Sequence, residues 1–178
     1  IVVSGFLGSG KTTFLRRFIM QSKKKFGLLV NEFGEVGIDG DLIRSCNSCD
    51  DISKECVIEL NNGCLCCTVQ DDFIPSIKSL LRFNLDLEAI IIETSGLALP
   101  IPLLKALDWP EIRTEVYLDL VIAAVNGESM LNGTPINDLN DLTSQYDQIT
   151  KIEHNSSFKE LFEEQLEVAD IVLISRSD

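Results

Sequence analysis

The chain has 178 residues, 45% of them hydrophobic, which is enough to bury the core of one domain. Its 28 acidic and 15 basic residues give a formal net charge of −13, which disfavours binding to nucleic acid and favours binding to cations. The apolar runs are strand-sized, shorter than the roughly 18 residues that a membrane helix needs, so we expect a cytoplasmic protein without a membrane segment.

Short β-rich runs alternate with helical stretches along the chain. The expected strands are Ile1–Val3, Phe26–Val30, Cys56–Leu60, Ala89–Ile92, Tyr117–Val125 and a buried last strand, Ile171–Ile174. The expected helices start at Lys11, cover Phe73–Arg82, and start near Pro100 and at Ser157, where Glu160 completes a capping box and Phe158, Leu161, Phe162 and Leu166 form the apolar face. This alternation predicts an α/β fold with a mostly parallel central sheet flanked by helices. Two polar segments, Asn31–Glu55 and Gly127–Asn155, are expected to be long loops.

The segment from Gly5 to Thr12 matches the phosphate-binding pattern GxxxxGK[ST] and lies between the first strand and the first helix. Its glycines allow backbone N–H groups to face phosphate, Lys11 reaches the β and γ phosphates, and Thr12 offers its hydroxyl to Mg²⁺. The residues expected to bind the nucleotide here are Gly5, Gly8, Ser9, Gly10, Lys11, Thr12 and Thr13.

A carboxylate, Glu93, ends the apolar run before Thr94-Ser95-Gly96. The end of a buried parallel strand is where phosphates bind in such folds, so Glu93 is a Walker B candidate and is grouped with Lys11 and Thr12 as catalytic. Gly96 is expected to bring its backbone N–H to the γ-phosphate.

Ser175-Arg176-Ser177-Asp178 follows the last expected strand and resembles the guanine-reading Asn-Lys-x-Asp of GTPases. Asp178 has the acceptors that guanine N1 and N2 require, and the stem of Arg176 has the length to lie along the base. The alternative is an ordinary charged strand exit.

All six cysteines fall between Cys46 and Cys67, which suggests metal or redox chemistry. Cys64, Cys66 and Cys67 form a Cys-x-Cys-Cys cluster whose thiolates suit cobalt, zinc, nickel or copper. The alternatives are an inert buried cluster, or a closed zinc site shared with Cys46, Cys49 and Cys56. In the loop from Asn31 to Asp41, Glu35 and Asp39 are candidates to contact both Mg²⁺ and the cysteines.

Four motifs together resemble the CobW group of P-loop GTPases, which are related to the GTPases of hydrogenase and urease nickel maturation. They are Gly5 to Thr13, Asn31-Glu32-Phe33-Gly34-Glu35, Gly63 to Val69, and Glu93-Thr94-Ser95-Gly96-Leu97-Ala98. Three further segments look like the cobalamin-pathway branch of that group: Asp71 to Pro75, Asp108 to Arg113 and Glu160 to Gln165.

The resemblance implies a metallochaperone that binds Co²⁺ together with Mg²⁺ and GTP, and gives the metal to cobaltochelatase upon hydrolysis. It also implies that residues 1–178 are the GTPase domain of a longer protein that continues into a second domain. Two alternatives stay open, a zinc chaperone of the same group and a switch NTPase with a structural zinc site. A small-molecule P-loop kinase is disfavoured because no Arg-rich lid follows the loop.

Overall fold

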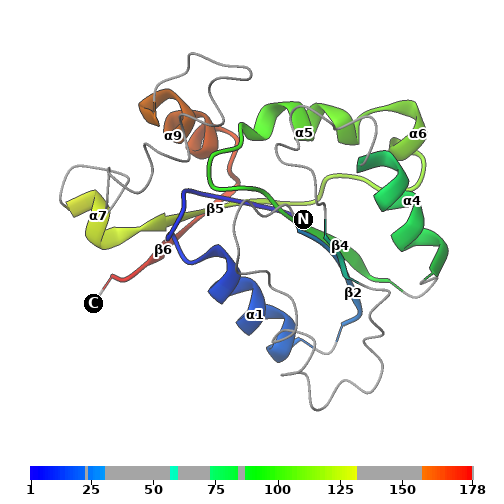
Figure 1. Cartoon of the computed structure of the whole chain (residues 1–178), viewed down its shortest axis with the longest axis horizontal. Helices are drawn as coiled ribbons and strands as arrows, with labels where there is room; N and C mark the ends of the chain where they lie inside the picture. Colours follow the sequence, from blue (N-terminus) through cyan, green and yellow to red (C-terminus); the bar gives the residue numbers. More distant parts are fainter. Residues whose placement is uncertain (23, 31–56, 60–72, 84–86, 132–157, 178) are drawn as a thin grey trace.

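The computed structural model describes residues 1–22, 24–30, 57–59, 73–83, 87–131 and 158–177 (Figure 1). The elements in these ranges are β1 (Val2–Ser4), α1 (Lys11–Gln21), β2 (Phe26–Val30), β3 (Val57–Glu59), α4 (Ile74–Phe83), β4 (Ala89–Glu93), α5 (Pro100–Leu107), α6 (Pro110–Arg113), β5 (Val121–Asn126), α7 (Gly127–Leu131), α9 (Phe158–Glu167) and β6 (Ile171–Ser175). No helix in the described part of the chain is long and apolar enough to cross a membrane.

The strands of the described ranges form one six-stranded sheet in the order β3-β2-β4-β1-β5-β6, and every neighbouring pair is parallel. This confirms the predicted α/β fold. Val30 at the end of β2 is in register with Glu59 at the end of β3 and with Glu93 at the end of β4. The carboxyl ends of these strands therefore share one edge of the sheet, where ligands bind in open α/β folds.

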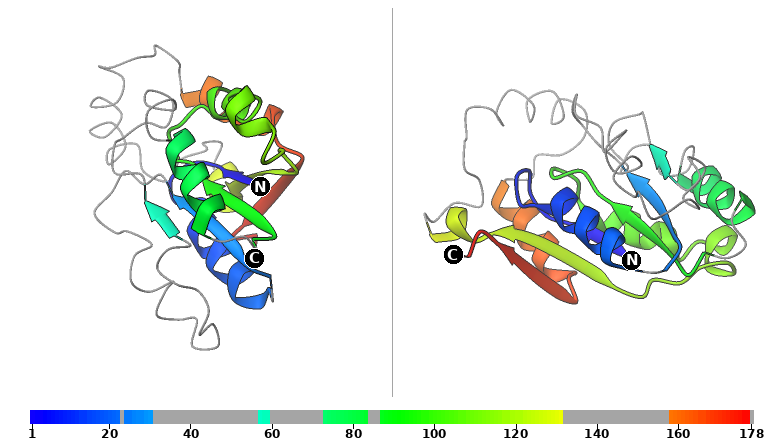
Figure 2. Two further views of the ribbon diagram at one scale, coloured as in Figure 1. Left: turned by 90° about the vertical axis from the view of Figure 1, so that its right-hand side faces the viewer. Right: turned by 90° about the horizontal axis from the view of Figure 1, so that it is seen from below.

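Helices cover both faces of the sheet, with α1 on one face and α4, α5 and α6 on the other (Figures 1 and 2). Successive strand residues point to opposite faces, so Val2 joins the core under α4–α6 while Val3 joins the core under α1. Both side chains are fully buried, which explains why the central strands are apolar at consecutive positions.

A third, smaller apolar cluster fastens α9 to the loop that follows β1. Leu161 on α9 is buried with Phe6 and Leu97, and the rings of Phe6 and Phe162 lie 5.7 Å apart. Leu161 and Phe162 belong to the predicted apolar face of this helix. Ser157 and the side chain of Phe158 lie outside the described residues, so the capping box stays a prediction.

The expectation that the last strand is buried is wrong. Ile171 and Val172 are each 48% exposed and Ile174 is 60% exposed. The reason is position, because β6 is at the edge of the sheet and pairs only with β5 in the described part of the chain. A run of four apolar residues does not distinguish an edge strand from a central one.

The fifth strand also begins later than expected, at Val121 instead of Tyr117. Tyr117 is 83% exposed and precedes the strand without regular structure. The residues that fit the β-pattern at 117–120 therefore belong to the connection between α6 and β5.

Backbone contact at Gly5 generates a prediction about stability. Gly5 has φ +132°, and a Cβ there would lie 2.2 Å from the carbonyl oxygen of Ala124. We expect Gly5→Ala to lower the free energy of unfolding by about 3 kcal/mol or more, through strain and overlap together. Urea denaturation measures this change.

Gly8→Ala is the matched control, because Gly8 has φ +71° but, among the described residues beyond its chain neighbours, no atom lies within 4 Å of an added Cβ. This variant should carry the backbone strain alone, about 1 kcal/mol. Equal losses in the two variants would contradict the role assigned to close packing at Gly5.

Candidate functional site

The loop between β1 and α1 is shaped by three glycines with positive φ: Gly5 at 132°, Gly8 at 71° and Gly10 at 90°. Residues with a Cβ rarely adopt this region, so the pattern of glycines sets the turn. Ser9 donates its N–H to the carbonyl of Phe6 at 3.2 Å, which closes the loop on itself. The result is a strand-loop-helix unit in which α1 begins directly at Lys11.

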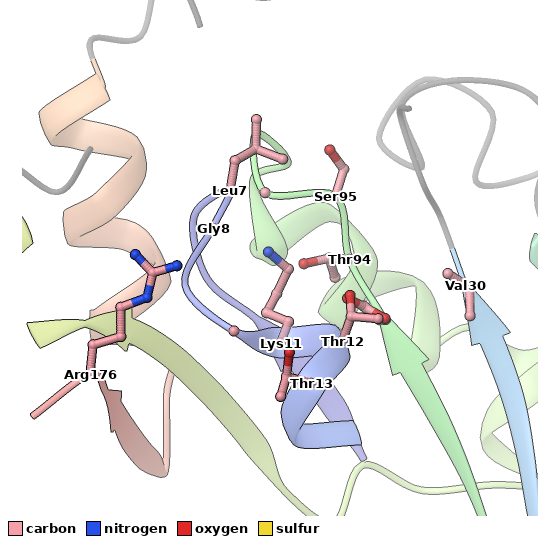
Figure 3. Close-up of a pocket in the computed structure, with 12 residues that line it drawn as sticks. Leu7, Gly8, Lys11, Thr12, Thr13, Val30, Thr94, Ser95 and Arg176 are labelled. Atoms are coloured by element: carbon pink, nitrogen blue, oxygen red, sulfur yellow. The ribbon is translucent and has the colours of Figure 1, made fainter. Parts of the chain in front are cut away.

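This loop forms one wall of a pocket of about 310 Å³ at the carboxyl edge of the sheet (Figure 3). The lining residues are Leu7, Gly8, Gly10, Lys11, Thr12, Thr13, Val30, Glu93, Thr94, Ser95, Gly96 and Arg176. The pocket thus brings together most of the nucleotide-binding and catalytic residues predicted from the sequence. Gly5 and Ser9 do not line it; both are buried and shape the loop behind it.

Lys11 is the buried cation of the pocket, with 7% of the residue exposed. Its ammonium donates to the carbonyl oxygens of Gly5 at 2.7 Å and Phe6 at 2.8 Å. An ammonium has three donors on a flexible stem, so contacts with the loop can be exchanged for contacts with a ligand in the same pocket. The location suits a side chain that neutralises phosphate.

Thr12 and Glu93 meet at the base of the pocket, although they are 81 positions apart in the chain. The Thr12 hydroxyl donates to Glu93 Oε1 at 2.9 Å, and Glu93 is only 5% exposed at the end of β4. A hydroxyl beside a carboxylate is the donor set of a hard, oxygen-binding cation such as Mg²⁺. The residues present therefore fit Mg²⁺ beside a phosphate.

The loop after β4 lies directly against the phosphate-binding loop. A Cβ added to Gly96 would lie 2.5 Å from the backbone nitrogen of Leu7, so only glycine permits this approach. Thr94 donates its N–H to the carbonyl of Val3 at 3.0 Å and fixes the start of the same loop. Gly96 is thus held at the pocket wall, and its contact with a γ-phosphate stays a prediction.

Ser175 was not singled out from the sequence, although it lies in the predicted base-reading motif. Its hydroxyl donates to the carbonyl of Ser9 at 2.8 Å and also meets the carbonyl of Val125 at 3.3 Å. The end of β6 is therefore tied to the phosphate-binding loop. The two residues are 166 positions apart, and no local pattern marks such a contact.

Arg176 lines the pocket on the side away from β4 and points toward the phosphate-binding loop (Figure 3). Its backbone has φ 48°, the left-handed region, and its guanidinium lies 3.9 Å from the carboxylate of Glu128. Both side chains are more than half exposed, so this ion pair contributes little stability. Contact of its stem with a base stays a prediction.

The remaining predicted site residues lie outside the described residues. They are Asp178 of the predicted base-reading motif, Glu35 and Asp39 of the first long loop, and Cys64, Cys66 and Cys67 of the cysteine cluster, together with Cys46, Cys49 and Cys56 of the alternative zinc site. Among the residues that the structure does describe, no group of three or more His, Cys, Asp or Glu side chains is placed to hold a metal ion.

A model of the CobW/HypB/UreG nucleotide-binding domain matches residues 1–178. The chain belongs to the CobW/HypB/UreG family. Within the CobW/HypB/UreG family it is 42% identical to a protein named zinc chaperone CobW from Sinorhizobium sp. and 43% identical to one of the same name from Pseudomonas aeruginosa. These matches cover 99% of the chain but 50% and 48% of the relatives, so the chain spans about half the length of the curated relatives it matches.

The structure resembles that of the Zn(II)-bound YjiA GTPase from E. coli, with a TM-score of 0.56 and 23% identity. The likeness covers 99% of this chain and 48% of that chain. At this level of identity it shows the fold alone, and that fold is the one expected for a member of the CobW/HypB/UreG family.

The contact between Ser175 and Ser9 generates a prediction about nucleotide affinity. Ser175→Ala leaves the Ser9 carbonyl without this donor and should loosen the loop that is predicted to bind the phosphates. We expect the affinities for GDP and for a non-hydrolysable GTP analogue to fall by a similar factor, about fivefold, as the loss of one hydrogen bond implies. Fluorescence titration with labelled nucleotides gives both values.

Ser175→Thr retains the hydroxyl and is the control, with affinities close to those of the unmodified chain. If Ser175→Ala binds both nucleotides as tightly as Ser175→Thr does, the contact does not support the loop.

Proposed function

We propose that this domain binds and hydrolyses GTP and uses the nucleotide to control the binding and release of a thiophilic metal ion, Zn²⁺, for delivery to an acceptor protein. One observation carries the proposal. Lys11, Thr12, Glu93 and Gly96 meet in a single pocket, at the sheet edge from which the cysteine-bearing segment continues after β3.

The pocket supports hydrolysis through charge neutralisation and positioning. The buried ammonium of Lys11 is available to the negative charge that develops on the γ-phosphoryl oxygens as water attacks phosphorus. The glycine-shaped loop presents backbone N–H groups at the beginning of α1, where the helix dipole also favours anions. The products are GDP and inorganic phosphate.

Thr12 and Glu93 are the residues that would hold Mg²⁺. When bound, Mg²⁺ supplies further neutralisation of the β and γ phosphates. The Thr12 hydroxyl is held 2.9 Å from Glu93 Oε1, so the two oxygen ligands are already adjacent. Burial of Glu93 under the loop keeps that carboxylate at the end of β4.

Sheet register supports coupling between the nucleotide and the metal. Val30 ends β2 in register with Glu93, and Glu59 ends β3 in register with Val30. Two strand spacings, about 10 Å, therefore separate the level of Glu93 from that of Glu59. Cys64 follows Glu59 by five residues, which limits its distance from the end of β3 to about 17 Å. Glu35 likewise follows Val30, the last residue of β2, by five residues, so the same limit applies to its distance from the end of β2.

The names of the relatives support zinc as the metal, because both CobW relatives are named zinc chaperones. Thiolates at Cys64, Cys66 and Cys67 suit Zn²⁺ as well as Co²⁺, and a site of comparable softness binds Zn²⁺ more tightly than Co²⁺. Delivery of Co²⁺ to cobaltochelatase stays a prediction from the resemblance. Such delivery requires that the geometry of the site or the supply of metal select Co²⁺ over Zn²⁺, because affinity does not.

The assignment of Lys11 predicts a loss of turnover. Lys11→Ala removes the pocket's buried ammonium, and we expect kcat for GTP hydrolysis to fall by at least about a hundredfold. Release of inorganic phosphate under saturating GTP measures this. Lys105→Ala, at an exposed position on α5, is the matched control and should hydrolyse GTP normally. Normal turnover by Lys11→Ala would exclude this pocket as the hydrolytic site.

The proposed coupling predicts that the nucleotide changes metal affinity. We expect Zn²⁺ to bind at least about tenfold more tightly with Mg²⁺ and a GTP analogue than with Mg²⁺ and GDP. Competition against a chromogenic chelator measures the affinity, and Co²⁺ in the same assay reports thiolate absorption that Cys66→Ala should remove.

Equal Zn²⁺ affinity in the two nucleotide states contradicts the coupling. If chelation of zinc instead unfolds the domain, the cysteines form a structural site, and the chain is a switch NTPase.

A further inference from the structure

Gln165 on α9 is a buried polar residue that the proposed mechanism does not use. It is 1% exposed, among the most buried side chains in the described part of the chain. A glutamine in that position costs free energy unless its amide is hydrogen-bonded, so its contacts indicate what it does.

The amide nitrogen of Gln165 bridges two carbonyl oxygens of the loop after β4. Nε2 donates to Gly96 at 3.4 Å and to Ala98 at 3.3 Å. The amide nitrogen has two hydrogens, one for each carbonyl, which fixes its orientation because the amide oxygen cannot donate. The opposite assignment would place three oxygens together.

The loop held in this way is the one that lines the nucleotide pocket. Gly96 and Ser95 are part of the pocket wall, and Gly96 abuts the backbone of Leu7 in the phosphate-binding loop. Gln165 itself is not a lining residue, so it acts on the pocket through the peptide groups that it holds.

The oxygen of the same amide has no hydrogen-bond partner within the described structure, although it is buried. One half of the side chain is therefore satisfied and the other half is not. A buried acceptor without a donor costs free energy, and the two donations by Nε2 together with the packing of α9 offset that cost.

We propose that Gln165 is a positioning residue that sets the Gly96 peptide for contact with the γ-phosphate and thereby makes the domain distinguish GTP from GDP. The inference rests on the proposed GTPase function. The α9 helix supplies a rigid support for this contact, since Leu161 and Phe162 anchor it on Phe6 and Leu97.

Gln165→Met tests the proposal, because methionine keeps the length and volume of the side chain but donates no hydrogen bond. The affinity for a non-hydrolysable GTP analogue should fall by about tenfold while the affinity for GDP stays within about twofold. Titration of both nucleotides gives the ratio, and Glu167→Gln, exposed on the same helix, is the control.

Gln165→Glu provides a second test if the methionine variant does not fold. A neutral carboxylic acid can donate one hydrogen bond to the carbonyls, whereas a carboxylate repels them. Burial at this position raises the pKa of the introduced carboxyl. Preference for the GTP analogue over GDP should therefore be low at pH 8 and should recover as the pH is lowered, with no such recovery in the unmodified chain.

An equal loss for both nucleotides, or no loss, overturns the positioning role and leaves Gln165 as a packing residue. Absence of binding to both nucleotides by the unmodified chain would instead refute the proposed GTPase function. Titration of the unmodified chain with GDP therefore distinguishes the two failures, because GDP binds if only the positioning role is wrong and does not bind if the proposed GTPase function is wrong.

Discussion

Close contact between backbone segments at the carboxyl end of β1 is the constraint on which the pocket depends. Gly5 lies against the carbonyl of Ala124, and Gly96 lies against the backbone of Leu7, both too close for any side chain. These contacts seat the phosphate-binding turn between the exits of β4 and β5. Lys11 and Thr12 are placed by that turn, and the hydrogen bond from Thr12 to Glu93 forms only because β4 ends beside it.

The parallel sheet places the pocket and the start of the cysteine-bearing segment at the same edge. Every described strand ends at the same edge, so the segments after β1, β2, β3 and β4 all leave the sheet on the side of the pocket. A change in the loop after β4 is therefore close to the beginning of the cysteine-bearing segment. The net charge of −13 makes the surroundings attractive to divalent cations, which helps capture but does not select among them.

Local patterns in the sequence predicted those features of the fold that depend on neighbouring residues, namely strands and short motifs. The strand Phe26–Val30 was predicted with its observed bounds, and the pocket brings Lys11, Thr12 and Glu93 together as their motifs indicated. Burial of β6 was predicted wrongly, because an apolar run does not reveal whether a neighbouring strand or helix covers it. The contacts of Ser175 and Gln165 were missed, because their partners are 166 and 69 positions away in the chain. Polar residues on a surface helix or at a strand end also normally face water.

The first serine of the predicted base-reading motif, Ser175, has a structural role in the pocket. Gly10 lies so near β6 that an added Cβ would be 3.4 Å from the Cβ of Ser175, and a short hydroxyl is enough to reach the phosphate-binding loop. The serine at this position therefore ties β6 to the phosphate-binding loop. We propose that guanine selectivity depends on Arg176 and Asp178, the two residues predicted to read the base. Arg176 adopts φ 48°, which costs about 1 kcal/mol, and this strained backbone turns its side chain toward the pocket.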